Sequence, residues 1–353
     1  MRKIQEYIIK DNNIFVGFED SKRTWKLCVR CDGMIVHEIS MPADYENLRT
    51  YLKGRYPGCV IKVIYEAGFS GFWLYDFLKR DGIDCVVTPP NKVTMEKDNK
   101  VKTDKRDARR LSRNLENKDY VSCFVPDKER REDRQISRIL EQIQRDINRT
   151  KNRIRRFLDF HGLNGSMPCG RWNRSDYNRL HSLKLNKILR ISLNSYLKLL
   201  SELESIRSNL MLELKELCKK ERYQKAVESK QSCPGIGWLT AIRLTLEWGE
   251  MSRFKTGKHI ASFTGLTSSE YSTGETIRKG RITGQSSKSV RAWLIQCAWT
   301  SIKRDPVLLE KFRNVWKNSG SKKKAIVAVA RKLAVRMRAI ELGEQPYCIA
   351  VAV

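Results

Sequence analysis

The chain has 353 residues, of which 69 are Lys or Arg and 40 are Asp or Glu, so its formal net charge is +29. This charge favours a polyanionic partner, and the length allows two domains or more. No apolar run approaches the length of a membrane span, and the first residues lack the apolar core of a signal peptide, so we expect a cytoplasmic protein with no membrane partner.

The positive charge is concentrated in the C-terminal two-thirds of the chain. Residues 1–110 hold a net charge of +5, whereas residues 111–353 hold +24. We therefore expect most of a nucleic-acid contact surface to lie after residue 110.

The N-terminal third predicts a mixed sheet with helices. Strands are expected over residues 14–19, 25–31, 34–39, 60–65 and 85–88, and helices over 46–56, over 71–79 and from 104 onward. Three strands in succession, followed by helix, strand, helix, strand and helix, is the order of a ribonuclease-H-like α/β fold.

Four carboxylates occur where such a sheet gathers its functional groups. Glu19 and Glu66 lie at the C-terminal ends of two expected strands, and Asp104 and Asp107 are three residues apart at the start of a helix. The alternative is that each acid only ends a strand or caps a helix. Four acids in one cleft repel one another unless cations are present, and two Mg²⁺ ions would make them a site for phosphodiester chemistry. The coincidence of four placements favours the metal site.

Basic residues surround the acid pair of the helix. Those that we expect to contact a phosphate backbone are Lys102, Lys105, Arg106 and Arg109. The alternative is a solvated helix start with charges of both signs.

From Asp127 the pattern changes to long helices. Apolar residues alternate at steps of four and three from Ile136 to Phe157, and a second seam follows from Tyr196 to Leu217. The two seams predict either a long antiparallel helical hairpin or a dimerising coiled coil. Arg149 and Arg153 lie between the positions of the first seam, where they are expected to contact nucleic acid or to form a solvated surface.

Two further motifs occur in the C-terminal third. In Pro234-Gly235-Ile236-Gly237, a glycine-rich turn before a helical stretch over 238–248 would present the N–H groups of Gly235 and Gly237 to a phosphate. Further on, Ser272 and Thr273 precede Gly274.

Arg278, Lys279 and Arg281 follow these hydroxyl residues. Hydroxyl groups beside guanidinium groups can position a nucleophile next to a phosphate, and the alternative is an ordinary polar loop. Helices are expected over 289–303 and 323–342.

In these residues the chain resembles the DEDD-type insertion-sequence transposases, which are recombinases guided by a bridge RNA and whose relatives include a pilin-gene DNA invertase. The resemblance covers nearly the whole chain. It runs through residues 17–22, 65–68, 102–108, 234–237, 265–274 and 328–333.

The resemblance implies three domains. They are a RuvC-like catalytic domain over residues 1–125, a coiled-coil helical linker over 126–225, and a C-terminal transposase domain over 226–353 with a helix-hairpin-helix-like turn and a nucleophile loop. By the same resemblance, a structured guide RNA pairs with double-stranded target and donor DNA. A homo-oligomer is also implied, a dimer or a tetramer on DNA, which would be nucleoid-associated when bound.

The resemblance also implies the roles of the site residues. Glu19, Glu66, Asp104 and Asp107 bind Mg²⁺ as catalytic residues, and a hydroxyl side chain attacks a DNA phosphate to form a covalent intermediate. The family's serine falls on Thr273, with Ser272 as the alternative nucleophile.

Two positions depart from the family pattern, because Glu19 replaces an aspartate and Thr273 replaces the serine. The alternatives to an active RNA-guided recombinase are therefore a weakened or inactive nucleic-acid-binding homologue and a RuvC-like junction nuclease.

Overall fold

The computed structural model describes residues 12–90, 103–166, 168, 170, 172–274, 276, 278–284, 286–343 and 345–349. The chain divides into two compact units, residues 1–125 and residues 126–353, and each is treated by itself. No helix within these described ranges is both long enough and apolar enough to cross a membrane.

The first unit is built on a five-stranded sheet. Its strands are β1 (Asn13–Glu19), β2 (Thr24–Cys31), β3 (Met34–Pro42), β4 (Val60–Glu66) and β5 (Asp84–Thr88). They lie in the order β3-β2-β1-β4-β5, with β1, β2 and β3 antiparallel and with β4 and β5 parallel to β1. The mixed α/β sheet expected from the sequence is confirmed.

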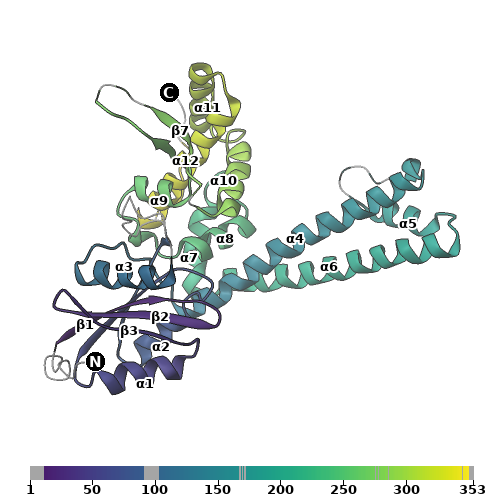
Figure 1. Cartoon of the computed structure of the whole chain (residues 1–353). Helices are drawn as coiled ribbons and strands as arrows, with labels where there is room; N and C mark the ends of the chain where they lie inside the picture. Colours follow the sequence, from purple (N-terminus) through teal and green to yellow (C-terminus); the bar gives the residue numbers. More distant parts are fainter. Residues whose placement is uncertain are drawn as a thin grey trace. The chain divides into compact units, whose positions relative to one another are not determined.

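Helices cover both faces of this sheet (Figure 1). They are α1 (Tyr45–Arg55), α2 (Trp73–Arg80) and α3 (Asp104–Glu116). Val16 and Phe18 of β1 belong to the core that includes Leu48 of α1 and Leu74 of α2. Leu111 of α3 instead packs with Ile64 of β4. Because side chains alternate along a strand, Glu19 and Glu66 point to the α3 face.

Gly17 allows α3 to approach this face closely. A Cβ atom at Gly17 would lie 2.0 Å from the carbonyl oxygen of Ala108 and 2.3 Å from the backbone nitrogen of Ser112. Both are main-chain atoms of α3, which cannot move aside as the end of a side chain can. The absence of a side chain at Gly17 therefore sets the depth of α3 on the sheet.

Two long helices dominate the first half of the second unit. α4 (Lys128–Phe160) and α6 (Lys187–Lys219) contain 33 residues each and lie side by side, with α5 (Arg174–Ser182) and a 3₁₀ turn (Asn164–Ser166) between them in sequence (Figure 1). We call this pair the α4–α6 arm. Ile147 and Ile154 of the first expected seam are buried against Leu193 and Leu200 of α6. The coiled-coil assignment and dimerisation stay predictions.

The remainder of the second unit is mostly helical. Its elements are α7 (Glu221–Gln231), α8 (Trp238–Trp248), a 3₁₀ turn (Met251–Arg253), α9 (Gly257–Phe263), β6 (Ser268–Glu270), β7 (Lys279–Ile282), α10 (Lys288–Ser301), α11 (Pro306–Ser319) and α12 (Lys322–Gly343). The expected core face of α12 is buried, from Ile326 to Met337. The helices α5, α7, α9 and α11 were not predicted. α11 has a local start signal, because Asp305 caps it and Pro306 begins it.

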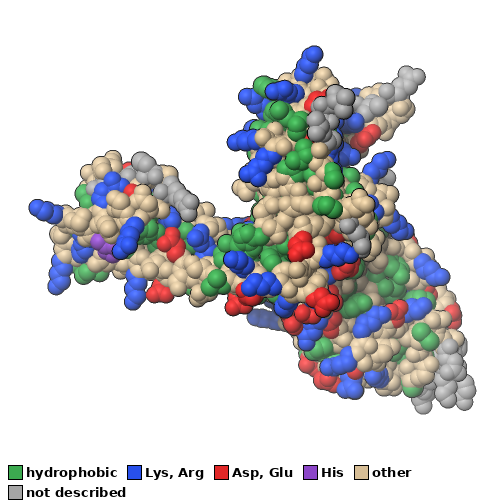
Figure 2. All heavy atoms as spheres, turned by 180° about the vertical axis from the view of Figure 1, so that it is seen from behind, with side chains coloured by type: hydrophobic (Ala, Val, Ile, Leu, Met, Phe, Trp, Pro, Cys, Tyr) green, Lys and Arg blue, Asp and Glu red, His purple; other side chains and the backbone are tan. Residues whose placement is uncertain are grey.

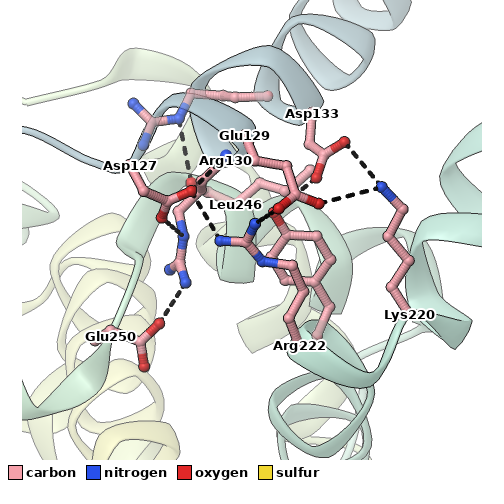
Figure 3. A network of polar contacts seen from close by, with 10 residues as sticks. Asp127, Glu129, Arg130, Asp133, Lys220, Arg222, Leu246 and Glu250 are labelled. Carbon is pink, nitrogen blue, oxygen red and sulfur yellow. Dashed lines mark hydrogen bonds and ion pairs between the residues drawn. The ribbon is translucent and has the colours of Figure 1, made fainter. Parts of the chain in front are cut away.

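A network of ion pairs joins the base of the α4–α6 arm to the C-terminal helices (Figure 3). Arg222 of α7 donates to Asp127 at 2.8 Å and also pairs with Glu129 at the start of α4. Arg130 is buried and pairs with Glu250, which follows α8. Lys220, between α6 and α7, lies 3.5 Å from Asp133. These contacts tie the first turns of α4 to two other parts of the second unit.

Candidate active site

The two glutamates of the candidate site end neighbouring parallel strands. β1 and β4 pair in register up to Phe18 and Tyr65, which are the residues immediately before Glu19 and Glu66. Both glutamates therefore lie at the same edge of the sheet, where the C-terminal ends of parallel strands gather functional groups.

The two aspartates lie in the first turn of α3. Thr103 caps this helix by accepting a hydrogen bond from the backbone nitrogen of Arg106, so Asp104 is the first helical residue. Asp104 is exposed and Asp107 is buried. Since α3 covers the face to which Glu19 and Glu66 point, the fold brings all four acids to one region of the first unit.

Electrostatic coupling between these acids is visible at Glu19. Burial, followed by the charges of Glu66, Asp107, Asp20 and Asp104, raises the pKa of Glu19 to about 7. One carboxylate oxygen of Glu19, Oε2, is buried and has no hydrogen-bond partner among the described residues. A buried, unpartnered carboxylate oxygen among like charges is stabilised by a cation.

Asp20 also belongs to this surrounding. It follows the last residue of β1, and its carboxylate lies near Gly68, where an added Cβ atom would be 3.8 Å from Oδ1 of Asp20. Its charge contributes to the raised pKa of Glu19. Successive residues of a strand point to opposite faces, but Asp20 is still close enough for its charge to act on Glu19.

Arg110 lies between two of the acids. Its Nη2 atom is 3.0 Å from Oε1 of Glu66 and 2.9 Å from Oδ1 of Asp107. In the described parts of the chain, no three acidic, histidine or cysteine side chains are close enough together to hold one metal ion. The acids thus share one region without converging on one point, and a guanidinium group lies between Glu66 and Asp107.

The chemistry of the residues nevertheless suits a hard divalent cation. Mg²⁺ takes oxygen ligands, and the four acids supply only carboxylate oxygens. The unpartnered Oε2 of Glu19 is the observation that points to a ligand at this position. Glu66 and Asp107 would have to give up their contacts with Arg110 to bind a common ion.

The basic residues predicted to contact nucleic acid in this segment have different surroundings. Lys105 and Arg109 both pair with Glu38 of β3, at 3.2 Å for Lys105. Arg106 is exposed, and Lys102 lies outside the described residues. Two of these cations are therefore already engaged with an acid of the first unit.

The predicted nucleophiles lie in the second unit, in an exposed β-hairpin formed by β6 and β7. The backbones of Thr273 and Thr276 bond to each other in both directions, around a turn with Gly274 at a φ of +53°. The hydroxyl group of Ser272 donates a hydrogen bond to Oε1 of Glu270 at 2.9 Å. Glu270 was not singled out from the sequence, although a spacing of two residues in an extended segment places it on the same side as Ser272.

The other predicted contact residues of the second unit fall into two groups. Arg278, Lys279 and Arg281 are exposed on and beside β7. Arg149 and Arg153 line a hollow of about 240 Å³ on α4 with Asn152 and Arg156. Figure 2 shows Lys and Arg side chains spread over the visible surface rather than gathered into a single patch.

The turn before α8 has a packing role that the sequence did not reveal. Gly235 has a φ of +85°, and a Cβ atom there would lie 2.9 Å from the backbone nitrogen of Ser301 in α10. The glycine is therefore needed for close approach of α10. Gly237 is exposed and precedes the first residue of α8, so its N–H group is the more accessible of the two predicted phosphate contacts.

A mixed five-stranded sheet with acids at adjacent strand ends is compatible with the ribonuclease-H-like fold of DEDD transposases. Residues 16–162 match the DEDD transposase family of IS110 elements, and residues 230–313 match the family described as "Transposase IS116/IS110/IS902 family". The chain belongs to the IS110-type family of DEDD transposases.

Three relatives illustrate the extent of the similarity. The transposase for insertion sequence element IS1533 of Leptospira borgpetersenii is 28% identical over 257 residues, which are 71% of this chain and 74% of that protein. The transposase-family protein y4rJ of Sinorhizobium fredii is 28% identical over 92% of this chain and 90% of its own length. The pilin gene-inverting protein of Moraxella bovis is 31% identical over 116 residues, 32% of this chain and 36% of that protein.

Proposed function

We propose that this protein is an RNA-guided, Mg²⁺-dependent DNA recombinase of a mobile element, which cleaves and exchanges strands through a covalent link between a hydroxyl side chain and a DNA phosphate. The observation that carries the proposal is the gathering of Glu19, Glu66, Asp104 and Asp107 at one edge of the first unit. Family membership supports DNA as the substrate, and the charge of the chain supports nucleic-acid partners.

The proposed division of labour follows the segments of the chain. Residues 1–125 form the RuvC-like catalytic domain, residues 126–225 form a coiled-coil linker, and residues 226–353 form the transposase domain with the nucleophile. The α4–α6 arm supports the linker assignment. An apolar stripe on the outer side of α6 supports oligomerisation, because Ile188, Ile191, Leu199 and Ile206 are exposed and lie on one side of the helix.

In this proposal the four acids hold the metal. When bound, two Mg²⁺ ions would favour attack on a phosphodiester and stabilise the oxygen that leaves. Glu66 and Asp107 come from a strand end and a helix turn, so their backbones are held in place while their side chains can rotate toward an ion. Octahedral Mg²⁺ coordination requires such a rotation to end with the carboxylates at well-defined positions.

The nucleophile is proposed to be Thr273, with Ser272 as the alternative. The hydroxyl oxygen attacks phosphorus and its proton passes to a base, while the bond from phosphorus to the deoxyribose oxygen breaks and that oxygen takes up a proton to become a hydroxyl group. The new phosphoester link conserves the energy needed for rejoining. Glu270 favours the Ser272 alternative, because its carboxylate already accepts the Ser272 hydroxyl proton in a hydrogen bond.

We expect the covalent adduct to identify the nucleophile. The full chain would be incubated with its guide RNA, DNA that carries an element end, and Mg²⁺, and the products would be separated on a denaturing gel. Thr273→Ala is expected to remove the protein–DNA adduct, whereas Thr273→Ser is expected to keep or increase it because only a crowding methyl group is lost.

The matched variants are Ser272→Ala and Glu270→Gln. An adduct that survives Thr273→Ala but disappears in both matched variants would assign the role to Ser272, with Glu270 as its base. If no variant, including Thr273→Ser combined with Glu19→Asp, ever gives an adduct, the inactive nucleic-acid-binding homologue becomes the better description. Mg²⁺-dependent cleavage without an adduct would instead favour a junction nuclease.

Guide-RNA binding is proposed to depend mainly on the second unit. Residues 126–353 contain 46 basic and 22 acidic residues, a net charge of +24. Binding should therefore release many counterions from the RNA.

We expect RNA affinity to fall by about a thousandfold between roughly 50 and roughly 200 mM salt. Filter binding at several salt concentrations would measure the slope, with a neutral osmolyte as the control for effects other than ionic screening. An affinity that does not change with salt would contradict an interface made by these charges.

A further inference from the structure

Arg110 is a basic side chain in direct contact with two acids of the candidate site. It lies one helical turn after Asp107 on α3, so the two side chains share a face of the helix, and from there it also reaches Glu66 on β4. A single nitrogen, Nη2, makes both contacts, at 3.0 and 2.9 Å. One positive group thus lies between a carboxylate of the sheet and a carboxylate of the helix that covers it.

The contacts are shielded from water. The side chains of Arg110, Glu66 and Asp107 are 15%, 20% and 6% exposed. The charges at this position are screened less than those of exposed ion pairs, so exchange of one cation for another has a large electrostatic effect. By contrast, the ion pair between Lys79 and Asp84 joins two side chains that are 41% and 52% exposed.

The guanidinium group is incompletely bonded in this position. Arg110 Nε is buried and has no hydrogen-bond partner among the described residues. A buried donor without a partner costs free energy, which lowers the cost of moving the guanidinium group away. Arg110 therefore neutralises two acids without being held by a complete set of hydrogen bonds.

Size and charge oppose simultaneous occupation by a metal ion. Mg²⁺ binds oxygen at about 2.0–2.1 Å, closer than the nitrogen–oxygen distances of Arg110, and it repels a neighbouring guanidinium group. We infer that Arg110 is an internal counter-cation of the acid site, which competes with the divalent metal ion for the carboxylates of Glu66 and Asp107. Arg110 then sets the metal concentration at which the site fills.

This competition rests on the metal site of the proposed function. Measuring metal affinity directly tests the metal site and the competition without relying on DNA cleavage. Mn²⁺ is the probe, and electron paramagnetic resonance of free Mn²⁺ in the presence of the full chain gives the dissociation constant. Arg110→Met is expected to tighten Mn²⁺ binding by on the order of tenfold, because the competing charge is gone. Arg110→Lys, which keeps a charge, is expected to stay closer to wild type.

Lys79→Met is the matched control, since it also removes one positive charge from the first unit. Lys79 pairs with Asp84, which lies at the end of β5 opposite the residue that pairs with Glu66. It should leave Mn²⁺ affinity unchanged. Equal Mn²⁺ affinity in wild type, Arg110→Met and Lys79→Met would overturn the competition while leaving the metal site in place. If neither wild type nor Arg110→Met binds Mn²⁺, the metal site and the competition both fail.

Thermal unfolding distinguishes competition from a purely structural ion pair. With EDTA present, Arg110→Met is expected to unfold at a lower temperature than wild type, because the acids have lost their counter-cation. Added Mn²⁺ is expected to remove that difference. A deficit that is the same with EDTA and with saturating Mn²⁺ would show that Arg110 only braces α3 against β4, and would overturn the inference.

Discussion

Asp107→Asn is expected to lower DNA strand cleavage by about a hundredfold or more while retaining nucleic-acid binding. Asparagine has nearly the same size, but it lacks the charge that a divalent metal ligand provides, and loss of such stabilisation is worth several kcal/mol in the transition state. Asp107 is buried on α3 and is coupled electrostatically to Glu19. Cleavage of element-end DNA under single-turnover conditions, with and without Mg²⁺, measures the effect.

Asp84→Asn provides the matched control for this prediction. Asp84 is a carboxylate of the same unit, but it begins β5, whereas the candidate acids lie near the ends of β1 and β4. Its replacement should leave cleavage unchanged. Normal Mg²⁺-dependent cleavage by both Asp107→Asn and Asp104→Asn would show that the acid site is wrongly assigned.

Gly17→Ala is expected to destabilise the first unit by about 3 kcal/mol or more. The added methyl group would collide with main-chain atoms of Ala108 and Ser112, so α3 would have to move away from β1. This displacement would also carry Asp104 and Asp107 away from the two glutamates. Denaturant unfolding of the full chain, with hydrogen exchange followed in peptides of β1 and α3, measures the loss.

Gly54→Ala is the control for replacing a glycine in the same unit. Gly54 lies within α1, and a Cβ atom there would meet nothing within 4 Å. Alanine favours a helix over glycine, so this variant should be more stable by roughly 0.5–1 kcal/mol. Unchanged exchange of α3 in Gly17→Ala would contradict the close packing of α3 against β1.

The sequence by itself determined the mixed sheet of the first unit. The strands were predictable because apolar residues alternate or run together between turn residues, and this local pattern sets which residues face the core. Because the strands could be predicted, Glu19 and Glu66 were recognised as candidates from their positions at two strand ends. The spacing of three residues at the start of a helical run placed Asp104 and Asp107 on one face of a helix, and both lie in the first turn of α3.

Helix content was harder to predict in the second unit. α5, α7, α9 and α11 escaped prediction, whereas α8 and the core face of α12 were expected. α5 and α9 contain only 9 and 7 residues, and such short helices gain much of their stability from tertiary packing, so their own residues show only part of the pattern. The hairpin of β6 and β7 was likewise hidden, because its polar residues are typical of a loop.

Only the tertiary structure decided which charges meet. Arg110 is one of several basic residues around the acid pair, and sequence spacing gives its nearness to Asp107 but not to Glu66, which is 44 residues away. Lys105 and Arg109 were equally basic candidates, yet they pair with Glu38 on β3. Which cation reaches which acid depends on the depth of α3 on the sheet, and Gly17 sets that depth through a contact between residues distant in sequence.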